Sequence, residues 1–308
     1  MSARSRGAAD APSLRARLFV GLQYTLPQHL LSRAVCHITR SRTRPLKNLL
    51  IRGFVRYFRP DMREAAQPDP LSYGSFNEFF TRALRPDARR VYPDPNTVAS
   101  PVDGLISQIG YLDGSQIMQA KGQTYALEAL LAPPAGVSAW AECFARGPFA
   151  TLYLAPFNYH RIHMPLSGTL RAAWHVPGRL FSVNATTAAC VAGLFARNER
   201  VVCLFQSEYG PFALVLVGAL FVGSMSTVWH HEIPRRGRSG SSLMLDLPVA
   251  AGAAPSSALE LQKGAEMGRF NMGSTVILLL PPGKFEWLPE RQAGTPIAFG
   301  EPLARLTS

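Results

Sequence analysis

A serine preceded by a glycine, Ser274 after Gly273, stands directly before an apolar run, TVILLLPP at 275–282. A Gly-Ser pair most often makes a turn and begins a strand. The pair could also do chemistry, because glycine has no Cβ and lets the Ser274 hydroxyl approach the Gly273 carbonyl in a geometry that other residues resist. A serine hydroxyl becomes a nucleophile when a neighbouring base accepts its proton.

Two other segments contain side chains that could activate a serine. The first is SPVDG at 100–104, where Asp103 lies in a turn and could simply bond to its own backbone. The second is FNYHRIHMP at 157–165, in which His160 and His163 are three residues apart. These imidazoles could pack, bind a metal or transfer protons near pH 7. Because the chain has no HExxH pattern and no neighbouring cysteine cluster, we expect no metal.

An aspartate, a histidine and a serine together supply the parts of an activated nucleophile. Such a serine could attack an outside substrate, as in an acyl hydrolase, although GSMST at 223–227 lacks the second glycine of a GxSxG elbow. It could instead attack its own preceding carbonyl. The resulting ester could undergo β-elimination to dehydroalanine, and loss of ammonia on hydrolysis would leave a pyruvoyl group. The residues themselves leave both targets open.

The elements that must position these residues are mostly short strands. From about residue 97 the chain consists of β-branched and aromatic runs separated by Gly and Pro, such as FATLYLAP, RVVCLF and FALVLVGALFVGSM. No long amphipathic helix alternates with them, which favours a mainly antiparallel sandwich or barrel. The chain has neither a GxGxxG motif after a strand nor a P-loop, so we expect no nucleotide cofactor. The Gly-, Ser- and Ala-rich segment 235–262 is predicted to be a surface excursion.

Helices are predicted nearer the N-terminus. One is predicted to begin at Ser75, with Glu78 at capping-box spacing, and to end at Pro86. A longer amphipathic helix is predicted over 45–60, with Pro45 at its first position. Its apolar positions recur every fourth residue, while its basic residues hold other faces. The apolar positions are Leu46, Leu50, Phe54 and Phe58, and the basic residues are Lys47, Arg52, Arg56 and Arg59.

Almost all of the formal charge of +12 lies in residues 1–63, which hold 13 basic and 2 acidic residues. The remainder is nearly neutral, as in a metabolic enzyme, so we expect no nucleic-acid partner. The apolar run 18–35 is interrupted by Gln23, Pro27 and Arg33 and is too polar for a spanning helix. The arginine-rich helix could pack on the domain with its arginines in water or lie on an anionic bilayer, and we favour the membrane surface.

The compartment is predicted from two further features. The first residues, MSARSRGAADAPS, lack the apolar region of an export signal. Cys36, Cys143, Cys190 and Cys203 are widely spaced, which favours free thiols in a reducing compartment.

Seven segments of the chain carry a resemblance to a known family: SPVDGLISQ, QAKGQTYALEALL, YHRIHMP, PGRLFSVN, LFARNERVVCLF, VGALFVGSMSTVW and KGAEMGRFNMGSTVI. Together they resemble the bacterial phosphatidylserine decarboxylase proenzyme family. The resemblance runs from about Leu18 to the C-terminal region and includes LQYTLPQHLLSR near the N-terminus. Met272 stands where the family's processing motif, LGST, usually has leucine, and a side chain of similar volume should be tolerated there.

The resemblance implies that the chain cuts itself between Gly273 and Ser274. The products would be a β chain of residues 1–273 and an α chain of residues 274–308 that begins with a pyruvoyl group derived from Ser274. Carried over by motif, Asp103, His163 and Ser274 would form the self-cleavage triad, and His160 would assist decarboxylation in the protonation step. Phosphatidylserine would form a Schiff base with the pyruvoyl ketone, lose CO2 and leave as phosphatidylethanolamine, without an external cofactor.

We therefore predict an α+β protein with N-terminal membrane-associating helices and a mainly antiparallel β sandwich or barrel as its catalytic domain. The predicted division is 1–70 for the basic helical segment and 71–308 for the catalytic domain. The enzyme is expected at the cytoplasmic side of the cell membrane, as a peripheral protein and a homodimer of processed units. A serine acyl hydrolase acting on lipids and a non-catalytic lipid-binding module are the alternatives.

Overall fold

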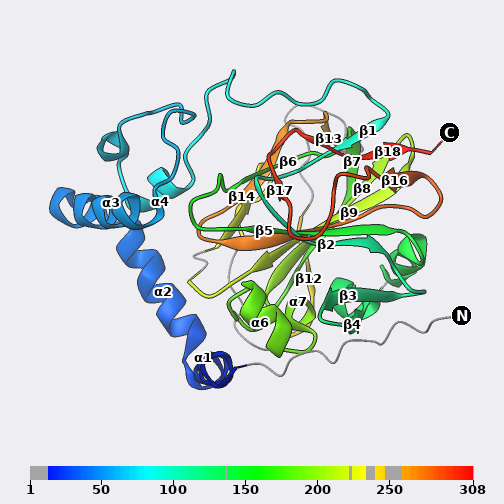
Figure 1. Cartoon of the computed structure of the whole chain (residues 1–308), viewed down its shortest axis with the longest axis horizontal. Coiled ribbons are helices and arrows are strands. Elements are labelled where there is room, and N and C mark those ends of the chain that lie inside the picture. The colour runs from blue at the N-terminus through cyan, green and yellow to red at the C-terminus, as the bar shows by residue number, and fades with distance from the viewer. Residues whose placement is uncertain (1–12, 136, 222–223, 234–239, 247–258, 308) are drawn as a thin grey trace, which may run out of the picture.

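Three helices form one side of the molecule and lead into a β-rich body (Figure 1). They are α1 (Leu14–Thr25), α2 (Gln28–Thr39) and α3 (Arg44–Phe58). The computed structural model describes residues 13–135, 137–221, 224–233, 240–246 and 259–307. Within those ranges, no helix has both the length and the apolar character needed to cross a bilayer.

Buried amides fasten α1 and α2 to the body. The side chain of Gln23 accepts from the backbone N–H of Ser182 at 2.8 Å, and that of Gln28 accepts from Leu180 at 2.9 Å. Gln23 and Gln28 are 1% and 4% exposed. The polar residues that interrupt this apolar run are therefore used for docking, because a buried amide is tolerated where its hydrogen bonds are made.

The predicted amphipathic helix forms as α3, with Pro45 in its first turn. Its apolar face packs on the body: Leu50 and Phe54 contact a buried cluster made by Ile51 and the aromatic residues of the next helix. Lys47 differs from expectation, since it is buried and its Nζ donates to the carbonyl of Leu71 at 2.8 Å. The arginines of α3 remain exposed on other faces: Arg44, Arg52 and Arg56.

The helix α4 (Phe76–Phe80) begins as predicted and ends earlier. Ser75 caps it by accepting from the N–H of Glu78 at 3.1 Å, and Glu78 accepts from Gly74 at 3.0 Å. The helix ends at Phe80 and not near Pro86. The next residue, Thr81, turns the chain, and its hydroxyl donates to the Asn77 carbonyl. Burial of both Phe79 and Phe80 holds this short helix in place.

The body is built on one nine-stranded sheet in which every described pairing is antiparallel. Its main path ends at β12 on one side and β17 on the other, so the described strands form an open sheet and not the barrel that was one alternative. The strands along the path are β12 (Leu243–Met244), β7 (Gly168–Val176), β8 (Arg200–Ser207), β9 (Gly210–Gly218), β15 (Ser274–Leu279), β5 (Pro148–Leu154), β2 (Gly104–Tyr111) and β17 (Pro296–Ile297), with β13 (Glu260–Leu261) also paired to β7.

Smaller elements cover both faces of this sheet (Figure 1). On one face lie a three-stranded sheet of β1 (Thr97–Ala99), β18 (Pro302–Leu306) and β16 (Phe285–Trp287), and a four-stranded sheet of β11 (His231–Glu232), β10 (Met225–Thr227), β14 (Glu266–Phe270) and β6 (Arg161–His163). On the other lie β3 (Gln116–Ala120), β4 (Gln123–Ala126), α5 (Leu127–Leu131), α6 (Ala185–Cys190) and α7 (Leu194–Arg197). The short 3-10 helices are η1 (Pro70–Ser72) and η2 (Ser138–Phe144).

The run of apolar residues in β15 is continuous because both faces of the large sheet are covered by other elements. Val276 and Leu278 belong to the core on one face of the sheet, and Ile277 and Leu279 to the core on the other. A strand buried on both faces has no polar alternation. Of the segment predicted as a surface excursion, β12 and β13 pair with β7, and residues 235–239 and 247–258 lie outside the described residues.

Candidate active site

Ser274 is the first residue of β15, at the centre of the large sheet. It pairs with Leu154 at the end of β5 and with Gly218 at the end of β9. Asn198 donates to the Gly218 carbonyl at 2.9 Å and fixes this strand end. The Ser274 side chain is fully buried, and its Oγ has no hydrogen-bond partner among the described residues. A buried hydroxyl without a partner is costly, which is typical of a reactive site.

The residues before Ser274 are clamped from two sides. Asn271 donates through Nδ2 to the Ser224 hydroxyl at 2.7 Å, while its carbonyl accepts from Asn77 Nδ2 of α4 at 3.0 Å. Met272 packs against the core beneath the sheet and against the cluster of α3 and α4. The Gly273–Ser274 bond therefore sits between a fixed asparagine and a fixed strand.

His160 lies beside this bond with one free nitrogen. Its Nδ1 lies 2.8 Å from the Asn158 carbonyl, which can only accept, so Nδ1 carries the proton and Nε2 has a lone pair. Nε2 is buried and without a partner among the described residues. A Cβ built on Gly273 would lie 3.9 Å from Nε2. Burial lowers the pKa of His160 to about 3, so the ring is uncharged at neutral pH.

His163 has the same tautomer and no free nitrogen. Its Nδ1 donates to the Gly264 carbonyl at 2.9 Å, and its Nε2 accepts from the Tyr159 hydroxyl at 2.9 Å. Burial raises the pKa of Tyr159, which keeps the phenol protonated as a donor. Burial also lowers the pKa of His163, against the opposing effect of nearby carboxylates. The ring stacks on Phe299 with a centroid distance of 3.7 Å.

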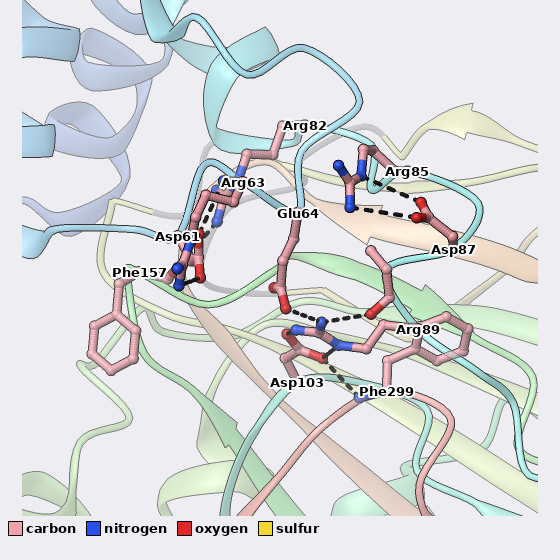
Figure 2. Close-up of polar contacts among 11 residues, drawn as sticks. Asp61, Arg63, Glu64, Arg82, Arg85, Asp87, Arg89, Asp103, Phe157 and Phe299 are labelled. Carbon is pink, nitrogen blue, oxygen red and sulfur yellow. Dashed lines mark hydrogen bonds and ion pairs between the residues drawn. The ribbon is translucent and has the colours of Figure 1, made fainter.

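Asp103 lies next to the same phenylalanine. Its Oδ1 accepts from the backbone N–H of Phe299 at 2.7 Å, and its Oδ2 accepts from Arg89 at 2.8 Å (Figure 2). Asp103 and His163 are thus brought together through Phe299, without a direct hydrogen bond between them in the described structure.

The structure therefore groups the four predicted residues as two pairs. His160 Nε2 lies near Gly273, the residue before Ser274, while Asp103 and His163 both contact Phe299. The assignment of Asp103, His163 and Ser274 to one self-cleavage triad stays a prediction, because no described contact joins Ser274 to the other two. In this uncut chain His160 is the imidazole placed beside the bond before Ser274.

An apolar cavity of about 270 Å³ opens onto Gly273 and Ser274. Phe54 and Phe58 of α3 and Phe80 of α4 line it together with residues of the sheet. Phe80 also contacts His160, with ring centroids 4.1 Å apart. The N-terminal helices therefore form part of the wall around the serine.

Comparison with known proteins shows the family of the chain. A family model described as phosphatidylserine decarboxylase matches residues 76–305, and a second one, described as PSD, matches residues 18–59. The chain is 51% identical over 288 residues to a protein named phosphatidylserine decarboxylase proenzyme from Bordetella pertussis, covering 94% of each chain. The chain belongs to the phosphatidylserine decarboxylase family. Proteins of the same name from Pseudomonas fluorescens and Methylococcus capsulatus are 48% and 46% identical, covering 94% and 92% of this chain and 98% and 95% of theirs.

Several residues of this decarboxylase family member that shape the site did not stand out in the sequence. Asn271 and Asn77 are ordinary polar residues until the fold brings them together from 194 positions apart. Arg89 and Phe299 reach Asp103 in the same way. By contrast, Arg200 is buried and donates to backbone carbonyls, including that of Leu130, so its guanidinium serves the packing of this region.

Proposed function

We propose that the chain converts phosphatidylserine to phosphatidylethanolamine with a pyruvoyl group that it makes by cutting itself between Gly273 and Ser274. One observation carries the proposal. Among the described residues, the Ser274 hydroxyl and the His160 Nε2 are both fully buried and have no partner, and the Gly273 that precedes Ser274 lies near this nitrogen and lines an apolar cavity. Buried polar atoms without hydrogen bonds are rare in folded proteins, and two of them close together are typical of a reactive site.

The cleavage steps follow from these atoms. Ser274 Oγ attacks the Gly273 carbonyl carbon while His160 Nε2 accepts the hydroxyl proton, because that nitrogen is uncharged and holds a lone pair. The peptide C–N bond breaks and an ester forms, with the proton passing to the amine. Removal of the Ser274 Cα proton by a base and cleavage of the Cβ–O bond then release Gly273 as a carboxylate and leave dehydroalanine. Its imine tautomer reacts with one water, which leaves the pyruvoyl ketone and ammonia.

The residues present fit the group that this reaction leaves. At the start of β15 the group would lie against the apolar cavity, with His160 beside it and Gly218 and Leu154 fixing the strand. A pyruvoyl carbonyl supplies an electron sink for the electrons released when a carboxylate leaves as CO2. His160 Nε2, which is uncharged at neutral pH, would accept a proton and pass it to the product carbon. In this proposal His160 takes the place of His163 as the base, and Asp103 and His163 stay predicted to assist self-cleavage as a pair that is held together at Phe299.

A lipid substrate suits the surroundings of the site. The cavity is lined by phenylalanines of α3 and α4, and large apolar side chains of α1 are exposed near its basic residues, including Leu14, Leu18 and Leu22. We propose peripheral attachment to the cytoplasmic face of an anionic membrane, where exposed arginines attract acidic lipids. The division at residue 70 and the homodimer remain predictions.

The test is conversion of phosphatidylserine in mixed micelles by the purified full chain and by Ser274→Ala. We expect phosphatidylethanolamine and CO2 from the wild type and neither from Ser274→Ala. Release of fatty acid in place of CO2 would support the acyl hydrolase instead. Binding of the lipid without any product would support the binding module.

A further inference from the structure

Arg89 connects the site to the segment that follows the N-terminal helices. Its guanidinium donates through Nη2 to Asp103 Oδ2 at 2.8 Å and through Nε to Asp103 Oδ1 at 3.4 Å. Its Nη1 donates to Glu64 (Figure 2). The Arg89 side chain is 17% exposed and that of Asp103 10%. A forked arginine contact of this kind fixes both the position and the plane of a carboxylate.

The opposite side of Asp103 is fixed by Phe299. The Phe299 N–H donates to Asp103 Oδ1 at 2.7 Å, and the Phe299 ring stacks on His163. A movement of the carboxylate would therefore move the residue that covers the imidazole. Arg89 and Phe299 together therefore set the position of the Asp103 carboxylate.

Glu64 gives the cluster its charge balance. One arginine between two carboxylates leaves the three residues with one net negative charge, so Arg89 orients Asp103 without neutralising the site. The two carboxylates act together to raise the pKa of Arg89, which keeps it charged. Glu64 is itself held by backbone pairing, because its carbonyl accepts from the Arg85 N–H at 2.8 Å.

Neighbouring ion pairs show what is particular to Arg89. Arg85 pairs with Asp87, and Arg63 with Asp61, in the same part of the chain (Figure 2). The side chains of Arg85 and Arg63 are 51% and 90% exposed. Pairs exposed to this degree contribute little, and neither is paired with Asp103.

We propose that Arg89 is a positioning residue for self-cleavage, which holds the Asp103 carboxylate beside His163 and is itself held by Glu64. This inference rests on the proposed cleavage between Gly273 and Ser274. It assigns to the segment after α3 a part in processing: Glu64 places Arg89, Arg89 places Asp103, and Asp103 and Phe299 place His163.

The rate of self-cleavage tests this role. Full chains made in a short cell-free pulse start uncut, and the appearance of the chain of residues 274–308 is followed by mass. Loss of a buried charged hydrogen bond predicts that Arg89→Met cleaves roughly tenfold to a hundredfold more slowly than the wild type. Arg89→Lys should restore part of the rate, because an ammonium keeps the charge and loses the fork. The matched control Arg85→Met should cleave at the wild-type rate.

Two measurements separate positioning from a general loss of structure. In an Asp103→Asn background, Arg89→Met should slow cleavage by less than about twofold, because Arg89 acts through Asp103. In an uncut Ser274→Ala background, Arg89→Met should melt within a few degrees of its parent. Wild-type cleavage by Arg89→Met, or an undiminished effect in Asp103→Asn, would overturn the inference.

If Arg89→Met does not fold, Arg89→Lys decides, and a full wild-type rate in that variant rejects the positioning role. A wild type that stays uncut contradicts the proposed function itself, and the inference falls with it.

Discussion

His160 and His163 share one tautomer and differ in what their second nitrogen does. In both, Nδ1–H donates to a backbone carbonyl, that of Asn158 or Gly264. The Nε2 of His163 accepts from Tyr159, whereas the Nε2 of His160, near Gly273, has no partner in the part of the chain that the structure describes. A second hydrogen bond thus decides which of two similar residues can act as a base. The resemblance implied different roles for the two imidazoles, His163 in self-cleavage and His160 in decarboxylation. It could not predict which Nε2 is occupied, because that depends on Tyr159 and the fold around it.

The buried, uncharged state of His160 predicts a pH dependence of stability. Its folded-state pKa is lowered to about 3, while an unfolded histidine titrates near about 6.5. As the pH falls below that value, the unfolded state takes up a proton that the folded state does not, so the folded state loses stability. Between pH 7 and pH 5 this costs about 2 kcal/mol.

The measurement is urea unfolding of uncut Ser274→Ala with and without His160→Gln. The unfolding free energy of the parent should fall by about 2 kcal/mol more between pH 7 and 5 than that of the double variant. His37→Gln, at an exposed position of α2, is the control and should follow the parent. Equal pH dependence with and without His160 would show that folding does not lower the pKa of the ring and would contradict this prediction.

At the scale of elements, α4 is a five-residue helix that holds much of the site. Its Asn77 binds the Asn271 carbonyl, its Phe80 contacts His160, and Phe79 and Phe76 join it to α3. A helix this short is not stable alone, so its aromatic contacts must supply the stabilisation. The capping box predicted where α4 begins, but the spacing to Pro86 did not predict its end, because the chain turns at Thr81 to bury Arg82.

Removing one of these aromatic side chains should destabilise the protein strongly. Phe79 is fully buried against Phe54 and Tyr73, with centroid distances of 5.7 and 5.8 Å. Phe79→Ala should lower the unfolding free energy by about 3–5 kcal/mol. Tyr57→Ala removes a side chain that is 80% exposed on α3 and should change it by less than about 0.5 kcal/mol. Similar effects for the two variants, measured by urea unfolding, would contradict this packing.

The amphipathic pattern of α3 predicted the helix but not its contacts. The four-residue repeat of Leu46, Leu50, Phe54 and Phe58 predicted a helix with one apolar face, and the helix is there. The pattern could not say what covers that face. In the structure Phe54 packs against α4 and lines the cavity at Ser274. Whether an apolar helix face contacts a bilayer or the protein depends on residues far away in the sequence, which a local pattern does not include.

At the scale of the whole molecule, the excess positive charge and many exposed apolar side chains lie in the N-terminal helices and not in the β-rich body. The excess of basic residues lies in residues 1–63, and several large apolar side chains of α1 and α2 are exposed beside them, including Phe19, Leu30 and Ile38. The α+β class and the antiparallel sheets were predicted from short strands and Gly/Pro spacing. The open order of the nine-stranded sheet was not, because strand order is not encoded in local patterns.

This distribution predicts binding to anionic vesicles through the helices. Replacing Arg52, Arg56 and Arg59 by Glu should lower the binding constant measured by flotation by at least about tenfold. The reason is that each basic residue near such a surface contributes about 1 kcal/mol. A matched triple reversal at exposed positions away from the helices, Arg146, Arg171 and Lys284, should bind as the wild type does. Equal losses in both triples, or no binding at all, would remove the membrane role.

The intact mass of the purified full chain under denaturing conditions tests the central claim most directly. The account predicts two chains, one of residues 1–273 and one of residues 274–308 whose mass corresponds to a pyruvoyl terminus in place of serine. Ser274→Ala should give one chain of full length. A wild type that remains a single uncut chain after folding in detergent or lipid would contradict the account.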